Sequence, residues 1–98
     1  MENLEGKTAV VTGAGSGIGA GIARAAAVAG MNVVVADIDQ ELASTVAQSI
    51  ISSGGDAIAV RTDVSDLAAM EALREAALKA FGAVHLVCNN AGVWVGAM

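Results

Sequence analysis

Four short apolar runs rich in Val and Ala alternate along the chain with three longer segments of helical periodicity. Runs that are apolar throughout are typical of strands buried on both faces of a sheet. Because crossovers between successive strands are right-handed, the alternation favours a parallel sheet with helices on both faces. We therefore predict a doubly wound, Rossmann-like α/β fold with strand order 3-2-1-4 that ends after its fourth strand. The predicted strands cover residues 8–11, 33–36, 57–60 and 84–87.

The segments between these runs repeat apolar residues at helical spacing. The first covers about residues 17–29. The second follows Asp39, a residue type that caps helices, and stops at Gly54-Gly55. The third is predicted to begin with Ser65 as its cap and to end at Gly82. The faces expected to meet the sheet are Ile18, Ile22, Ala26 and Ala29 in the first, Leu42, Val46 and Ile50 in the second, and Met70, Leu73, Ala77 and Phe81 in the third.

Charge and cysteine content limit the classes of partner. The formal net charge is −5, and the five basic residues are scattered, so we expect no nucleic-acid binding. The single cysteine cannot form an internal disulfide and fits a reducing compartment, so we expect a cytoplasmic protein. The acidic N-terminus differs from a secretory signal, and the apolar runs are too short to span a membrane, so we expect no membrane association.

The first predicted strand runs directly into the glycine-rich sequence of residues 12–19, TGAGSGIG, within which a helix begins. Backbone N–H groups near Ile18 and Gly19 should therefore point outward without partners, as in a pyrophosphate site. Gly13 would permit the sharp turn, and Gly17 would let phosphate approach the backbone. Gly19 would let the helix lie close to the strand. The alternative is a merely flexible turn.

The glycine spacing does not fit the G-x-G-x-x-G pattern, because Ala20 takes the last place of the only register that comes near. It fits T-G-x-x-x-G-x-G, and in this the sequence resembles the short-chain dehydrogenase/reductase family, whose cofactor loop has that form. The resemblance covers the whole chain, so residues 1–98 are expected to form one NAD-binding domain. It implies a nicotinamide dinucleotide as partner, bound at the loop by Gly13, Gly15, Ser16, Gly17, Ile18 and Gly19.

Asp37 ends the second predicted strand, where an acidic side chain in such a fold accepts hydrogen bonds from the adenosine ribose hydroxyls. The same carboxylate would repel the 2′-phosphate of NADP, by roughly 4 kcal/mol at ~4 Å and an effective dielectric of about 20. Ser16 and Ile38 stand where family members that favour NADP often carry Lys or Arg. We therefore expect NAD to be preferred over NADP. The alternative, that Asp37 caps the next helix, is weaker because Asp39 is better placed.

Two further segments follow predicted strands. Asp63-Val64 resembles the family's pair that reads the adenine edge, although without the resemblance Asp63 could equally be a helix N-terminal charge. The segment Asn89-Asn90-Ala91-Gly92 resembles the family's N-N-A-G signature. That resemblance implies that Asn89 ties the central strands together and that Asn90, Ala91 and Gly92 line the cofactor; a plain turn is the alternative.

His85 and Cys88 are the residues that most suggest a nucleophilic pair or a metal site. Three positions apart on a strand, they would face opposite sides of the sheet, so we expect both in the core and no metal. The fourth strand is expected to leave a hydrophobic edge at residues 84–87, through which the chain could self-associate.

The family transfers hydride between nicotinamide and an alcohol or carbonyl substrate, with Tyr, Lys, Ser and Asn assisting. This sequence contains no tyrosine, and in the family these catalytic residues lie beyond the point where it stops. We expect the chain to be the cofactor-binding portion of an oxidoreductase that binds NAD without turnover, its substrate bound only by the complete protein. Alternatives are a stand-alone nucleotide-binding or regulatory module, and another Rossmann-like enzyme such as a methyltransferase, against which the N-N-A-G segment argues.

Overall fold

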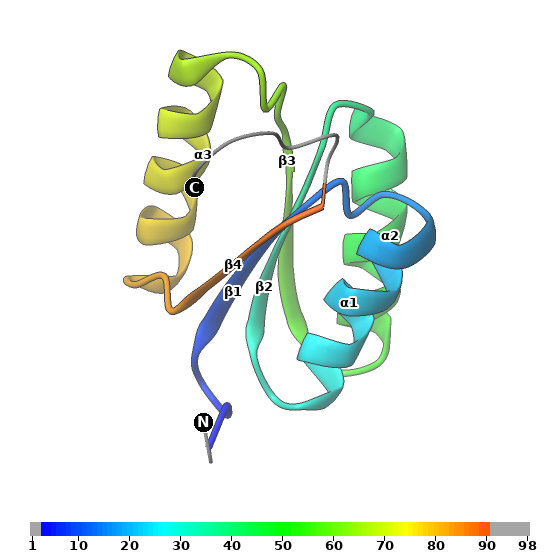
Figure 1. Ribbon diagram of the computed structural model, residues 1–98. Coiled ribbons are helices and arrows are strands. Elements are labelled where there is room, and N and C mark those ends of the chain that lie inside the picture. The colour runs from blue at the N-terminus through cyan, green and yellow to red at the C-terminus, as the bar shows by residue number, and fades with distance from the viewer. Residues whose placement is uncertain (1–2, 91–98) are drawn as a thin grey trace.

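The computed structural model describes residues 3–90, in which strands and helices alternate along the chain (Figure 1). The strands form one parallel sheet in the order β3-β2-β1-β4, which confirms the predicted fold class and strand order. In chain order the elements are β1 (Thr8–Thr12), α1 (Gly17–Val28), β2 (Asn32–Asp37), α2 (Gln40–Ser52), β3 (Asp56–Arg61), α3 (Leu67–Phe81) and β4 (Leu86–Asn89).

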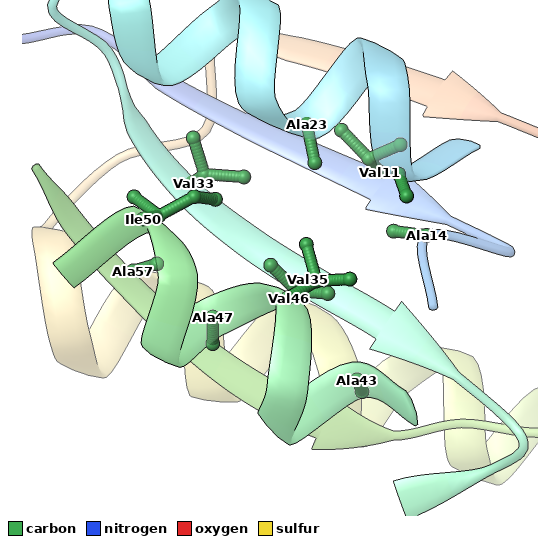
Figure 2. Close-up of a cluster of buried hydrophobic side chains, with 11 residues drawn as sticks. Val11, Ala14, Ala23, Val33, Val35, Ala43, Val46, Ala47, Ile50 and Ala57 are labelled. Atoms are coloured by element: carbon green, nitrogen blue, oxygen red, sulfur yellow. The ribbon is translucent and has the colours of Figure 1, made fainter. Parts of the chain in front are cut away.

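Helices cover both faces of the sheet, with α1 and α2 on one face and α3 on the other (Figure 1). Successive residues of a strand point to opposite faces, so β1 and β2 divide their valines between two cores. Val11, Val33 and Val35 lie under α1 and α2, as Figure 2 shows. Val10 and Val34 pack with Leu73 of α3 on the other face.

The prediction for the buried face of α1 holds in part, since Ile22 and Ala26 are half-buried and pack against the core. Gly19, Ala20 and Ala23 are its buried residues, whereas Ile18 is 76% exposed and Ala29 is exposed at the C-terminal cap. The apolar pattern was misleading because α1 approaches β1 so closely that small residues must form the contact. In α2 the same preference for small residues buries Ala43 and Ala47 beside the predicted Val46 and Ile50, and leaves Leu42 42% exposed.

The predicted helix ends at Asp39 and Gly82 are confirmed, whereas the predicted cap at Ser65 is wrong. The Asp39 side chain accepts from the backbone N–H of Leu42 at 3.1 Å, and Gly82 is the C-terminal cap of α3. Asp66 caps α3 instead of Ser65, by accepting from Ala68 N–H at 2.9 Å. The Ser65 side chain is instead directed to Asp63, to which its hydroxyl donates, and Ser65 precedes the residue that caps α3.

Strand β4 begins later than predicted, at Leu86, because the His85 side chain takes the place of a backbone acceptor in the pairing with β1. The backbone N–H of His85 donates to the Thr8 carbonyl at 2.9 Å, and its imidazole Nδ1 accepts from Thr8 N–H at 3.0 Å. His85 is exposed, so the expectation that it lies in the core is wrong, whereas Cys88 is half-buried and packs against the core. In the part of the chain that the structure describes, β4 pairs only with β1, and Val87 is 56% exposed, so the expected hydrophobic edge is present.

No helix within residues 3–90 has the length and apolar character needed to cross a bilayer.

Candidate cofactor-binding site

The predicted site residues lie at the carboxyl ends of the parallel strands, which share one edge of the sheet. The glycine-rich loop follows β1, Asp37 ends β2, and Asp63 and Asn90 follow β3 and β4 closely. Ligands of doubly wound folds bind at this edge, where neighbouring strands connect to helices on opposite faces. Ala91 and Gly92 lie outside the described residues.

The loop from β1 into α1 depends on its glycines. Gly13 and Gly17 have φ of 63° and 59°, a left-handed conformation that side-chain-bearing residues rarely adopt. Nothing lies within 4 Å of the position that a Cβ on Gly17 would take, so its surface is open to a ligand. A Cβ on Gly19 would instead collide with the carbonyl group of Gly13 and lie 2.9 Å from the side-chain nitrogen of Asn90.

The start of α1 has no side-chain cap. Ser16 is its N-cap residue, yet its side chain makes no capping hydrogen bond, and the first turn carries no acidic residue. The starts of α2 and α3, in contrast, are capped by Asp39 and Asp66. An uncapped helix start presents free N–H groups and the positive end of the helix dipole, which favour an anion such as phosphate.

Asp37 connects the end of β2 to the loop and to α2. Its Oδ2 accepts from the backbone N–H of Gly15 at 2.9 Å, and its Oδ1 accepts from the backbone N–H of Asp39 at 2.9 Å. Asp37 is not the cap of α2, since that bond is made by Asp39. Ile38, beside it, is largely exposed and brings no charge.

A pocket of about 160 Å³ brings the loop and two strand ends together. Sequence reasoning missed Thr62, a buried residue of the lining whose N–H donates to the Asp37 carbonyl at 2.9 Å. Its position immediately before Asp63, at the same strand end, is the sequence signal that would have found it. The lining residues are Gly13, Asp37, Ile38, Thr62, Asp63 and Val64.

Asp63 is a half-buried carboxylate whose pKa is lowered by its neighbours. The Ser65 hydroxyl, donating at 2.6 Å, lowers the pKa of Asp63 below its ordinary value, and the Ser65 backbone N–H at 3.0 Å adds to the effect. Arg61 contributes through its charge. Both Ser65 donors reach Oδ1, so Oδ2 can accept from a ligand amino group.

Arg61 is a second residue that sequence reasoning did not consider. It ends β3 and is paired in register with Asp37 of β2, so a basic residue lies at the same edge of the sheet as the candidate site. The predicted preference for NAD took account of Ser16 and Ile38 only. Whether the charge of Arg61 favours binding of NADP is therefore a question for mutagenesis.

Thr12, the first residue of the glycine-rich motif, ties β4 to β1. Its buried hydroxyl donates to Asn89 Oδ1 at 2.8 Å and accepts from the backbone N–H of Asn90 at 2.9 Å. Asn89 therefore makes a bond between central strands, as the resemblance implies for it. Because Asn90 Nδ2 lies beside Gly19, the end of β4 and the start of α1 also meet at this point.

A family model described as short chain dehydrogenase matches residues 7–98. The chain belongs to the short-chain dehydrogenase family. Among its relatives, an uncharacterised oxidoreductase of Methylorubrum extorquens is 47% identical over 95 residues, which are 96% of this chain and 38% of that protein. The 7alpha-hydroxysteroid dehydrogenase of Escherichia coli is 44% identical over 91% of this chain and 35% of its own length.

Solved structures of family members share the fold. A hydroxysteroid dehydrogenase from Escherichia coli superposes with a TM-score of 0.90 at 43% identity, covering 93% of this chain and 39% of that one. A short chain dehydrogenase/reductase from Burkholderia phymatum, in complex with NAD, gives 0.86 at 46% identity, over 89% of this chain and 31% of that one. The chain thus spans less than half the length of these relatives.

The close approach at Gly19 predicts a stability difference between two neighbouring glycines of α1. Gly19→Ala should lower the free energy of unfolding by ~1–3 kcal/mol, because the new Cβ meets the Gly13 backbone. Gly21→Ala, with nothing within 4 Å, should leave it unchanged or raise it by up to ~1 kcal/mol through helix propensity. Denaturant unfolding of the full-length proteins measures both, and equal effects would contradict the contact.

The bonds to Asp63 predict a pH effect. Ser65→Ala removes the hydroxyl donor and retains the backbone donor, so the pKa of Asp63 should rise toward its ordinary value of 3.8. Because folding lowers the pKa of Asp63, the hydrogen bonds to its carboxylate stabilise the folded protein fully at pH values above the unfolded-state pKa. This stabilisation is lost as the pH falls through the folded-state pKa. A carboxyl ¹³C titration by NMR measures the pKa, with Ser53→Ala as control. An unchanged pKa in Ser65→Ala would refute the cause assigned here.

Proposed function

We propose that residues 1–98 are the NAD-binding domain of an oxidoreductase that transfers hydride between a nicotinamide cofactor and an alcohol or carbonyl substrate. The observation that carries the proposal is the pairing of Asp37 with an uncapped helix start across the glycine-rich loop. An acceptor for ribose hydroxyls is hydrogen-bonded to the same loop that leads into the phosphate donors of α1, as the two parts of a nucleotide require.

The residues present fit a dinucleotide. The N–H groups at the start of α1 would bind the pyrophosphate, which the open surface of Gly17 lets approach. The pocket beside Asp37 would receive the adenosine, with Asp63 accepting from its exocyclic amino group and Val64 N–H donating to its ring. Asn90, Ala91 and Gly92 would line the nicotinamide side. When bound, the cofactor accepts or supplies the hydride.

NAD is proposed as the preferred cofactor. Asp37 can accept from the ribose hydroxyls of NAD, whereas the 2′-phosphate of NADP offers this carboxylate only like charge. Ser16 and Ile38, at the positions beside the adenosine ribose, carry no charge to offset the repulsion. Arg61 is exposed and paired in backbone register with Asp37, which makes it the residue to test as a source of compensation.

We propose that this chain alone binds NAD without turnover, because the chain contains no tyrosine to serve as the family's general acid/base. The substrate would be bound by the complete protein. The lone cysteine favours the cytoplasm as the location of the protein.

Where nothing covers the exposed edge of β4, we propose that copies of the chain self-associate through it, since Val84 and Val87 border an apolar groove beside α3.

The cofactor preference predicts the outcome of two substitutions at one sheet edge. Asp37→Ala should reduce the ratio of NAD to NADP affinity by about tenfold or more, which corresponds to ~1.4 kcal/mol. Arg61→Ala, the matched control, should preserve or increase the ratio. Calorimetric titration of the full-length variants with both dinucleotides measures the two affinities. An Asp37→Ala protein that discriminates as strongly as the parent would refute the assignment.

A further inference from the structure

The carboxylate of Asp37 is held from two sides by backbone donors. Gly15 N–H reaches Oδ2 and Asp39 N–H reaches Oδ1, each at 2.9 Å. A carboxylate has about four acceptor sites, so these two bonds leave roughly one site on each oxygen. The carboxylate keeps room for two ribose hydroxyls while its orientation is fixed.

The bond from Gly15 depends on the absence of a side chain there. A Cβ on Gly15 would lie 2.9 Å from Asp37 Oδ2 and 2.6 Å from Leu42 Cβ, closer than atoms can pack, so loop, carboxylate or α2 would have to shift. The φ angle of Gly15 is not in the left-handed region, so its backbone can accept alanine. Alanine at this position therefore tests the contact and not the backbone conformation.

We propose that Gly15 is a positioning residue that makes Asp37 discriminate between dinucleotides, an inference that rests on the proposed NAD site. Fixed by Gly15 and Asp39, the carboxylate cannot rotate away from a 2′-phosphate without losing a hydrogen bond to a charged group. Without the bond from Gly15, the Asp37 carboxylate can rotate away from the 2′-phosphate, so NADP is repelled less. The glycine would act through Asp37 and not by direct contact with the 2′ position of the ribose.

The test is a double-mutant cycle on the full-length protein. The affinities of NAD and NADP are measured for the parent, Gly15→Ala, Asp37→Ala and the double variant, with Gly21→Ala as the matched glycine control. Gly15→Ala should reduce the NAD to NADP affinity ratio about tenfold in the parent background. It should change the ratio less than twofold in the Asp37→Ala background, because the residue through which it acts is gone. Gly21→Ala should leave the ratio at the parental value.

Other outcomes overturn the inference in distinguishable ways. If Gly15→Ala weakens both dinucleotides equally, or lowers the ratio equally in both backgrounds, Gly15 shapes the loop without acting through Asp37. If the ratio does not change, the bond has no bearing on selectivity. A parent that binds neither dinucleotide, or does not prefer NAD, refutes the proposed function itself, and the inference falls with it.

A second measurement keeps the proposal testable if Gly15→Ala does not fold. Backbone amide exchange is followed by NMR in the parent and in Asp37→Ala. The Gly15 amide should lose protection in the variant, because its acceptor has been removed. The neighbouring Ala14 amide, which donates to the Ala36 carbonyl at 3.0 Å, should keep its protection. Unchanged protection at Gly15 would contradict the hydrogen bond from Gly15 to Asp37 on which the proposal rests.

Discussion

The close approach of α1 to β1, backbone against backbone at Gly19 and Gly13, is the contact on which the rest of this structure depends. It brings the start of the helix close to the end of the strand, so the connecting loop must turn sharply, and the first N–H groups of α1 are left without a side-chain cap. It also brings the helix so near the sheet that Ala20 and Ala23, not the larger Ile18, form the buried face. The site and the core therefore share one steric requirement.

Around this contact, each strand end contributes a different chemical group. β1 leads into backbone donors, β2 ends in a fixed carboxylate, and β3 is followed by a half-buried carboxylate whose pKa Ser65 lowers. β4 is joined to β1 through the buried hydroxyl of Thr12. Because the strands are parallel, these groups gather at one edge although a helix separates each from the next in the sequence. A parallel sheet thus assembles a polar site that no single segment contains.

The sequence allowed the sheet order, the helix positions and the strand-end location of the candidate residues to be predicted, because apolar periodicity and chain crossovers depend on local pattern. The errors arose where tertiary contacts outweighed the pattern. Ile18 is exposed because close packing selects small residues, and β4 starts late because the His85 imidazole takes the place of a backbone acceptor. The Asp66 cap and the proximity of Arg61 to Asp37 depend on side-chain partners and strand register, which periodicity does not specify.

Hydrogen–deuterium exchange of the full-length protein, with and without saturating NAD, tests most directly whether this edge of the sheet is a dinucleotide site. If NAD binds at this edge, it should slow exchange in residues 13–19, which hold the loop and the start of α1, and at residues 37–38. Residues 49–55, at the far end of α2 beside the separate cavity that Arg24 lines, should exchange at the same rate in both states. Protection confined to residues 49–55, or no protection of residues 13–19 at saturating NAD, would contradict the proposed site.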